Sequence, residues 1–291
     1  MSSPALERIE QLRGMDEFKA LAQRLQRVAE NKRKLPMSTI QLPNYLFIEA
    51  PGCGVTTHIR MITDLLVELR LIPFAGDRKF FEWALDSEAF GPDGSFPRLL
   101  DEISIMAGFH SSFKGVIGVE IEAWQNHSGH DGFTRLLNLA EDTLGQILFI
   151  FTARMQQDGD PVDLIRRLSM EMPLEVIHFP LPSSDDMALY LSDFLRRRRF
   201  RVALPTLEEF KRVMPQLMAA KAFDGFPTLE NLAAEIVYRY CASADRSDST
   251  LILPEDVQFI SEPGGYIDRF TNKTVMPKAR PIGFQSGGAL L

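Results

Sequence analysis

A short glycine-rich segment has the residue types and the spacing of a loop that binds phosphate. It follows the apolar run at residues 45–48 and precedes apolar residues at helical spacing that begin near Thr56. A glycine turn between a strand and a helix directs backbone N–H groups and the helix N-terminus at an anion. The candidate nucleotide-binding residues, for ATP or ADP with Mg²⁺, are therefore Pro51, Gly52, Cys53, Gly54, Val55, Thr56 and Thr57.

The segment departs from the usual phosphate-loop pattern, G-x-x-x-x-G-K-[ST], at two positions. Glu49 stands at the first glycine and Val55 at the lysine, whereas Gly54 and Thr56 match. The loop therefore lacks the cation that reaches the outer phosphates, and it has a carboxylate at its start. Thr56 keeps the hydroxyl that could ligate Mg²⁺. Taken alone, the segment is also explained as a tight turn, with Cys53 as a small loop residue.

The elements around this loop alternate between strands and helices. Apolar runs predict strands at residues 45–48, 80–84, 115–121, 147–152 and 175–179. Helical spacing predicts helices from Pro4, from about Asp16, from about Thr56, and over residues 97–106 and 133–142. Near-continuous apolar strands with helical crossovers indicate a parallel sheet that is covered on both faces. The predicted fold class is therefore α/β.

Composition shifts divide the chain into four predicted parts. Residues 1–36 form N-terminal helices and a basic linker, and residues 37–182 form the α/β domain with the glycine loop. After Pro180 and Pro182 the pattern becomes helical, which predicts a small helical domain over residues 183–260. Residues 261–291 form a tail with little periodicity, for which we expect some order around residues 282–284.

Charge and composition exclude several classes of protein. The net charge of −7, from 32 basic and 39 acidic residues, argues against a sequence-independent nucleic-acid binder. The two cysteines, Cys53 and Cys241, have no metal-type spacing and indicate no disulfide framework. The polar N-terminus is not a signal peptide, and no apolar run approaches the roughly 20 residues that span a bilayer. We expect a cytoplasmic protein without membrane contact.

The order of its segments resembles that of the AAA+ ATPases, in particular the branch of the red-type rubisco activases and the sporulation stage V protein K group. The similar segments lie within about residues 6–260. They are Gly14-Met15-Asp16-Glu17-Phe18-Lys19, the glycine loop, Leu69-Arg70-Leu71-Ile72, Phe81-Glu82-Trp83, Asp86-Ser87, and residues 114–120, 175–179, 224–226, 229–232 and 253–257. The resemblance implies a P-loop nucleotide-binding α/β domain followed by a helical lid, assembled as a ring with ATP at the subunit boundaries.

The resemblance also assigns positions in the Walker B strand. Glu120 matches the metal-side aspartate, which makes Thr56 and Glu120 the candidate Mg²⁺ ligands if nucleotide binds. Ile121 matches the catalytic glutamate and cannot polarise water. Glu122 lies one residue further on, and on a strand it shares a face with Glu120 rather than with the expected base. Glu120 and Glu122 are therefore only degenerate catalytic candidates.

Three further positions lack the expected side chain or match it poorly. Ala153 stands where the family often has a sensor asparagine, and the lid segment at residues 225–228 has no arginine. Arg166 and Arg167 lie near the position of the trans-acting arginine, but the match needs a shift of several residues.

Phosphoryl transfer needs both positioning and charge stabilisation, so losing the lysine, the glutamate, the asparagine and the lid arginine together indicates a pseudo-ATPase. We expect a structural or regulatory subunit, either a homo-oligomer or a hetero-oligomer with an intact AAA+ homologue. One alternative is a working ATPase whose cation and base are Arg60, Arg154 or Glu122. Another is a DNA-associated AAA+ adaptor, which the acidic balance opposes.

Two other clusters of residues each have a functional and a purely structural interpretation. His127 and His130 have H-x-x-H spacing, but Gly129 between them favours an exposed loop over a metal site. The basic run at residues 196–199, with Arg201, is explained as a solvated helix end that the helix dipole favours. The alternative for this run is a contact with an acidic neighbouring subunit.

Overall fold

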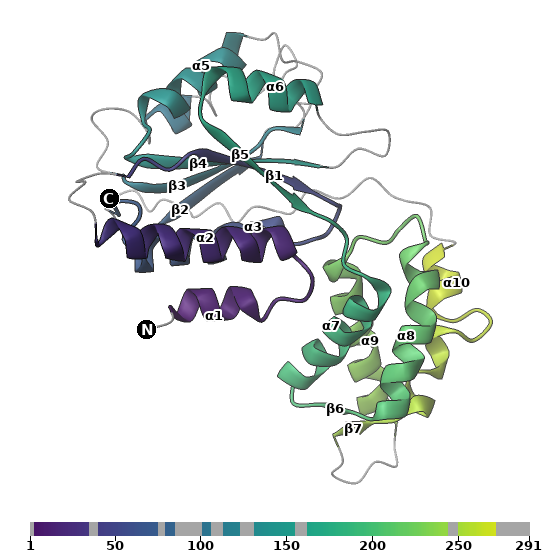
Figure 1. The fold of residues 1–291 in the computed structure, drawn as a ribbon. Helices are drawn as coiled ribbons and strands as arrows, with labels where there is room; N and C mark the ends of the chain where they lie inside the picture. The colour runs from purple at the N-terminus through teal and green to yellow at the C-terminus, as the bar shows by residue number, and fades with distance from the viewer. Residues whose placement is uncertain are drawn as a thin grey trace, which may run out of the picture. The chain divides into compact units, whose positions relative to one another are not determined.

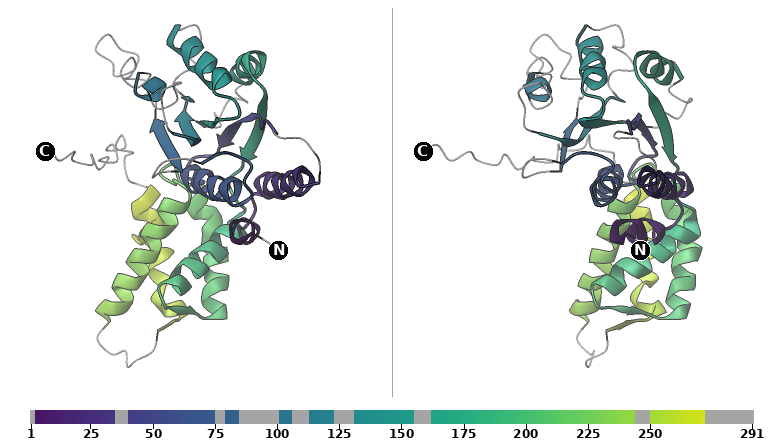
Figure 2. Two further views of the ribbon diagram at one scale, coloured as in Figure 1. Left: turned by 90° about the vertical axis from the view of Figure 1, so that its left-hand side faces the viewer. Right: turned by 60° about the vertical axis from the view of Figure 1, so that its left-hand side comes forward.

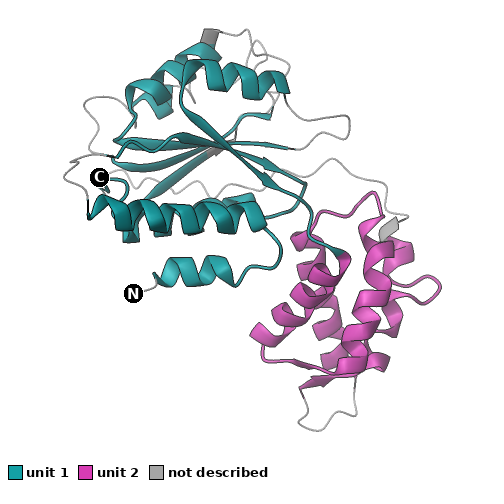
Figure 3. Cartoon of the chain, viewed as in Figure 1, with its two compact units in different colours: residues 1–183 teal, residues 184–291 magenta. Residues whose placement is uncertain are grey.

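The computed structural model describes residues 3–34, 40–74, 79–84, 101–105, 113–122, 131–154, 162–243 and 250–271. Its contacts divide the chain into two compact units, residues 1–183 and residues 184–291 (Figure 3). The first unit holds a sheet and the second is built mainly of helices (Figure 1). The finer division into four parts stays a prediction.

The first unit is built on a five-stranded sheet with the order β2-β3-β4-β1-β5, in which every pairing is parallel. The strands are β1 Asn44–Glu49, β2 Phe80–Ala84, β3 Gly115–Glu120, β4 Ile147–Arg154 and β5 Leu174–Phe179. Nearly every residue of β1, β3 and β4 is buried, because helices cover both faces of a parallel sheet. The predicted α/β fold class with a parallel sheet is confirmed.

Helices cover the two faces of this sheet in separate groups. The helices of the first unit are α1 Pro4–Glu10, α2 Asp16–Lys32, α3 Val55–Glu68, α5 Asp131–Asp142 and α6 Val162–Glu171. Figures 1 and 2 show α2 and α3 side by side on one face, with α1 packed against them on the side away from the sheet, and α5 and α6 on the other face. Residues 101–105 of the predicted 97–106 helix are helical, and the rest of that helix lies outside the described residues.

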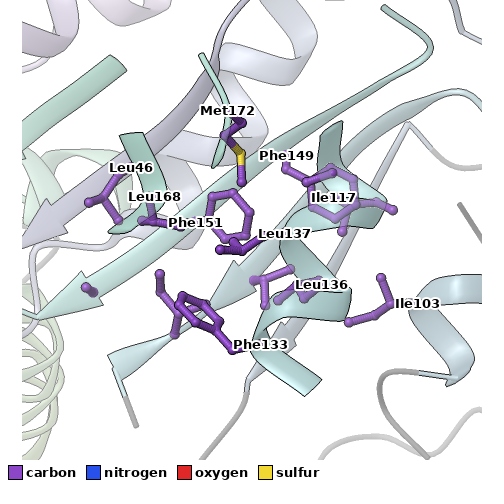
Figure 4. Packing of buried hydrophobic residues seen from close by; sticks show 14 of the residues in the cluster. Leu46, Ile103, Ile117, Phe133, Leu136, Leu137, Phe149, Phe151, Leu168 and Met172 are labelled. Atoms are coloured by element: carbon purple, nitrogen blue, oxygen red, sulfur yellow. The ribbon is translucent and has the colours of Figure 1, made fainter. Parts of the chain in front are cut away.

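The main hydrophobic core fills the space between the sheet and the α5 and α6 helices (Figure 4). Phe149 and Phe151 on β4 stack with ring centroids 5.9 Å apart. Phe133 of α5 and Leu168 of α6 are buried in the same cluster. These side chains hold β4 and β3 in place, and the ends of these strands form the rim beside the glycine loop.

The second unit is a helical bundle with a small two-stranded parallel sheet. Its elements are α7 Ser184–Arg197, β6 Arg201–Val202, α8 Leu204–Met218, α9 Phe226–Ala242, β7 Leu251–Ile252, the 3-10 helices η3 Pro254–Asp256 and η4 Gln258–Ile260, and α10 Tyr266–Thr271. The helical character of this region agrees with its sequence pattern, whereas β6, β7 and α10 have no counterpart in the predicted elements. The order expected at residues 282–284 lies outside the described residues.

Among the described helices, none combines the length and the hydrophobicity that crossing a membrane requires.

Candidate phosphate-loop site

The glycine loop follows the carboxyl end of β1, and β1 lies between β4 and β5 in the sheet. Gly52 has φ 74° and Gly54 has φ 76°, and both values lie in the left-handed region that glycine adopts without strain. Gly54 is the N-cap of α3, which begins at Val55. The spacing of these glycines therefore follows from the turn that joins a central strand to a helix.

Hydrogen bonds hold the loop against the end of β5. The Ala50 N–H donates to the Phe179 carbonyl at 2.9 Å, and the Cys53 N–H donates to the Ala50 carbonyl at 3.3 Å. The Cys53 thiol is buried and donates to the Pro180 carbonyl at 3.6 Å. Burial, together with the Glu49 charge, raises the pKa of Cys53 to about 12, so the thiol is protonated and is not a nucleophile.

Glu49 is the last residue of β1, directly before the glycine loop. The backbone N–H of Val55, the first residue of α3, lowers the pKa of its carboxyl group. Burial is the main reason that the pKa of Glu49 rises to about 7; Glu120 and Glu122 raise it further, whereas Arg154 and the Val55 N–H lower it. The start of the loop therefore has an acidic group whose charged form its surroundings disfavour.

The strand β3, which resembles a Walker B strand, contributes carboxylates at the same carboxyl end of the sheet. Glu120 is the last residue of β3 and lies opposite Thr152 of β4 in the parallel register. Glu122 forms an ion pair with Arg154, with 3.4 Å between the Oε2 and Nε atoms. Arg154 in turn lies opposite Glu49 in the register between β4 and β1. The structure thus brings Glu49, Glu120, Glu122 and Arg154 together.

Ile121 has no access to this edge. Its side chain is 0% exposed and belongs to the hydrophobic core on the α5 and α6 side of the sheet. Its backbone N–H donates to the Thr152 carbonyl at 2.8 Å, which continues the strand pairing. A carboxylate at this position would have to leave the core to reach water, so the local packing suits isoleucine and not a catalytic base.

Thr56 keeps its hydroxyl, but this group is engaged within the chain. Its Oγ1 donates to Oε1 of Glu82 on β2 at 2.8 Å. Glu82 was not singled out as a site residue, because only the folded sheet brings β2 near α3. No group of three or more metal-ligating His, Cys, Asp or Glu side chains occurs in the described part of the chain. Thr56 and Glu120 as Mg²⁺ ligands stay a prediction.

These residues do not fit a magnesium–triphosphate complex in the arrangement that the structure has. Val55 supplies no cation, Glu49 adds an acidic group at the start of the loop, and the Thr56 hydroxyl contacts Glu82. Three carboxylates and one arginine, Arg154, act on the same strand edge. We therefore derive no chemical step through a bound nucleotide.

The two arginines near the trans-acting position lie on α6 and have partners within the chain. Arg166 is exposed, and its guanidinium lies 4.0 Å from Asp163. Arg167 donates to the Thr134 hydroxyl at 3.2 Å and lies 3.7 Å from Glu171. A role for either residue in a neighbouring site stays a prediction.

The remaining predicted site positions carry no reactive group. Ala153 is 1% exposed and lies in the core. At the position of the lid arginine, Thr228 is buried, and its hydroxyl accepts a hydrogen bond from the Asp224 N–H at 2.9 Å. His127 and His130 lie outside the described residues.

His58 is a buried polar residue of the loop region that the sequence reasoning did not consider. It lies on the first turns of α3, and its ring packs between Phe18 and Phe179, with centroid distances of 5.1 and 5.0 Å. Burial lowers the pKa of His58 to about 4, so the ring is neutral at pH 7. In the sequence, the only indication that His58 is buried is its position among the apolar residues of α3.

Comparison with solved structures identifies the fold. One match is the structure of C. elegans PCH-2, with a TM-score of 0.53 and 12% identity over 86% of this chain and 69% of that one. Another is the crystal structure of the FIGL-1 AAA domain, with a TM-score of 0.53 and 14% identity over 85% of this chain and 80% of that one. The chain has the AAA+ fold. Neither comparison with protein-family models nor comparison with curated proteins finds a match.

Within the AAA+ fold, the glycine loop occupies the place of the phosphate loop, after a central strand and before a helix. At about one identical residue in eight, the likeness concerns the backbone and carries no information on activity. The chemistry must therefore be argued from the side chains of this chain.

Proposed function

We propose that the chain is a pseudo-ATPase that acts as a structural or regulatory subunit of a cytoplasmic AAA+ assembly. The observation that carries this proposal is the place of Ile121, which stands at the position of the catalytic glutamate and lies wholly within the core. The nearest carboxylate along the chain, that of Glu122, is ion-paired with Arg154.

The glycine loop supports the same proposal independently. Val55 stands at the position of the lysine that would neutralise the outer phosphates, and Glu49 stands at the position of the first glycine. Stabilising the charge of a transferring phosphoryl group is the main task of such a site. A loop that presents negative charge to the phosphates works against that task.

The assembly partner is a second copy of this chain or an intact AAA+ homologue. The preserved sheet and helical unit support this part of the proposal, since a subunit that contributes only surface needs the fold and not the catalytic groups. In such an assembly the chain would position the neighbouring subunits, and a neighbour would hydrolyse ATP.

Steady-state phosphate release from MgATP tests the proposal. Wild-type chain and Thr56→Ala should show the same background rate at every ATP concentration, because the retained hydroxyl has no catalytic partner. A rate that saturates with ATP in the wild type and disappears in Thr56→Ala would overturn the proposal.

The second candidate is an ATPase with an atypical site. The observation that favours it is Arg154, a cation beside Glu49 at the loop edge and 3.4 Å from Glu122. In this candidate Arg154 would replace the loop lysine and Glu122 would be the base. It requires saturable binding of MgATP, so a calorimetric titration that shows no binding at millimolar ATP eliminates it.

A further inference from the structure

We propose that an arginine patch on the second unit, made of Arg197, Arg198, Arg199 and Arg201, binds an acidic segment of a partner protein. The patch lies at the end of α7 and the start of β6 (Figure 1), and no residue of the glycine loop belongs to it. The inference goes beyond the proposed function, because it names a contact surface and the chemistry of its partner. It requires neither nucleotide binding nor its loss.

The arginines of the patch are exposed, and among the described residues they have no acidic partner. The neighbouring Arg196 differs, since its Nη1 atom lies 3.3 Å from Oδ1 of Asp193. No such ion pair joins a patch arginine to an acidic side chain in the part of the chain that the structure describes. The guanidinium groups therefore repel one another and favour an anion from outside the chain.

Aromatic rings hold two of these arginines in place. The guanidinium carbons of Arg198 and Arg197 lie 4.6 and 5.6 Å from the centroid of the Phe194 ring, within the range of a cation–π interaction. Phe194 stacks on Tyr190 with centroids 6.0 Å apart, and the Tyr190 hydroxyl donates to Glu230 at 2.8 Å. An arginine that is already ordered on a ring loses less freedom when it binds a ligand.

The helix dipole explains only part of this basic run. The helix α7 ends at Arg197, and the dipole acts within the last turn, so Arg199 lies beyond it. Arg199 also has φ 70°, in the left-handed region where a helix end usually has glycine. The Phe200 N–H donates to the Leu195 carbonyl at 3.1 Å across this turn. An arginine here is less stable than glycine would be, so closing the helix does not account for it.

The charge of the whole chain favours a short acidic segment over nucleic acid. The net charge is −7. A long polyanion bound at the patch would also face the negative charge of the rest of the chain, whereas a short peptide contacts the patch alone. The planar guanidinium groups of Arg197 and Arg198 fit the two oxygens of a Glu or Asp carboxylate.

The test is the fluorescence anisotropy of a labelled octaglutamate peptide, titrated with the full chain at low salt. Arg198→Lys keeps the charge and removes the planar group over the Phe194 ring. Phe194→Leu removes the ring and leaves every charge in place. The matched control is Arg196→Lys, which makes the same change on the same helix turn at an arginine outside the patch.

We expect saturable binding to the wild type that weakens as salt is added, because exposed ion pairs are screened. Arg198→Lys and Phe194→Leu should each weaken binding about twofold to fivefold, the size of an exposed charged contact, and Arg196→Lys should not change it. A wild type that does not bind the peptide would overturn the inference. Unchanged affinity in Arg198→Lys, or an equal loss in Arg196→Lys, would also overturn it, since either shows that only diffuse charge matters.

If Phe194→Leu does not fold, the two exposed lysine variants decide. An oligothymidylate of the same length is titrated in parallel, and tighter binding of this DNA than of the peptide would overturn the choice of a protein partner. The failure of this inference and that of the proposed function are distinguishable. Phosphate release by the wild type would contradict the proposed function alone, whereas the absence of peptide binding would contradict only the role of the arginine patch.

Discussion

At the residue scale, removal from water moves the pKa values of two groups near the glycine loop in opposite directions: the partly buried Glu49 at the end of β1 and the buried His58 on α3. The pKa of Glu49 rises to about 7 and that of His58 falls to about 4. In both cases removal from water disfavours the charged form. Because the two effects on stability oppose each other over overlapping ranges of pH, differences between variants and the wild type are more informative than the wild-type curve.

Glu49→Gln should gain stability relative to the wild type as the pH rises from about 4.5 to about 7. The folded-state pKa of Glu49 lies above its unfolded value of 4.5, so the folded wild type holds a proton that it loses through this range at a cost in stability. The relative gain should reach on the order of 2–3 kcal/mol. Urea unfolding at pH 5 and pH 8 measures it, and a gain that does not change with pH would contradict the burial of Glu49.

His58→Phe should remove part of the acid sensitivity of the chain. The folded-state pKa of His58 lies below its unfolded value of 6.5, so the wild type loses stability as the pH falls from about 6.5 towards 4, by up to roughly 3 kcal/mol. Phenylalanine preserves aromatic packing against Phe18 and Phe179 and takes up no proton. Thermal unfolding at pH 7 and pH 4.5 compares the two proteins; parallel losses in both would show that His58 is not responsible.

At the element scale, the strands were predictable because a parallel sheet buries both faces and leaves continuous apolar runs. The strand β4 is an example, with seven of its eight residues buried. The helix α6 was not predicted, because its apolar pattern is blurred by Val162 and Met170, which are 55% and 77% exposed. The order of the strands depends on helix crossovers that hydrophobicity does not encode.

Only those features of the candidate site whose residues are neighbours in the sequence were predictable. The glycine turn and the missing lysine are local features and were visible from their spacing. The contact of Thr56 with Glu82 and the approach of Arg154 to Glu49 need the strand order β2-β3-β4-β1.

Gly115→Ala should weaken the edge of the sheet. A Cβ atom at Gly115 would lie 2.6 Å from the Lys79 carbonyl oxygen and 3.0 Å from the Phe113 ring, so the backbone next to β2 must shift. We expect a loss of about 1–3 kcal/mol in the free energy of unfolding, measured by urea denaturation. Gly118→Ala is the control, because its nearest neighbour is the Phe80 side chain at 3.1 Å, and it should lose less. Equal losses would contradict this account of β3.

At the scale of the whole molecule, the chain has the AAA+ fold, and the proposed function holds that it has lost the groups for ATP hydrolysis. The hydrophobic core, the parallel sheet and the helical unit depend on apolar packing, which the loss of site residues leaves intact. A protein can therefore lose catalysis and keep the surfaces through which it assembles.

Assembly should not depend on nucleotide. Light scattering on the purified chain, alone and mixed with an intact AAA+ homologue, should give a mass above that of one chain in at least one of the two samples. Adding MgATP to the chain alone should leave its mass unchanged, because the proposed function gives the loop no part in holding the subunits together. A mass of one chain in both samples would contradict the role as a subunit, and assembly of the chain alone driven by MgATP would contradict the account of the loop.

The most direct test of the central claim is a single-turnover measurement, with purified chain in excess over radiolabelled MgATP and phosphate release followed over time. Excess protein removes any limit from product release and detects even one round of hydrolysis. The account predicts that release equals that of Thr56→Ala and of buffer. Release of phosphate by the wild type that Thr56→Ala abolishes would contradict it.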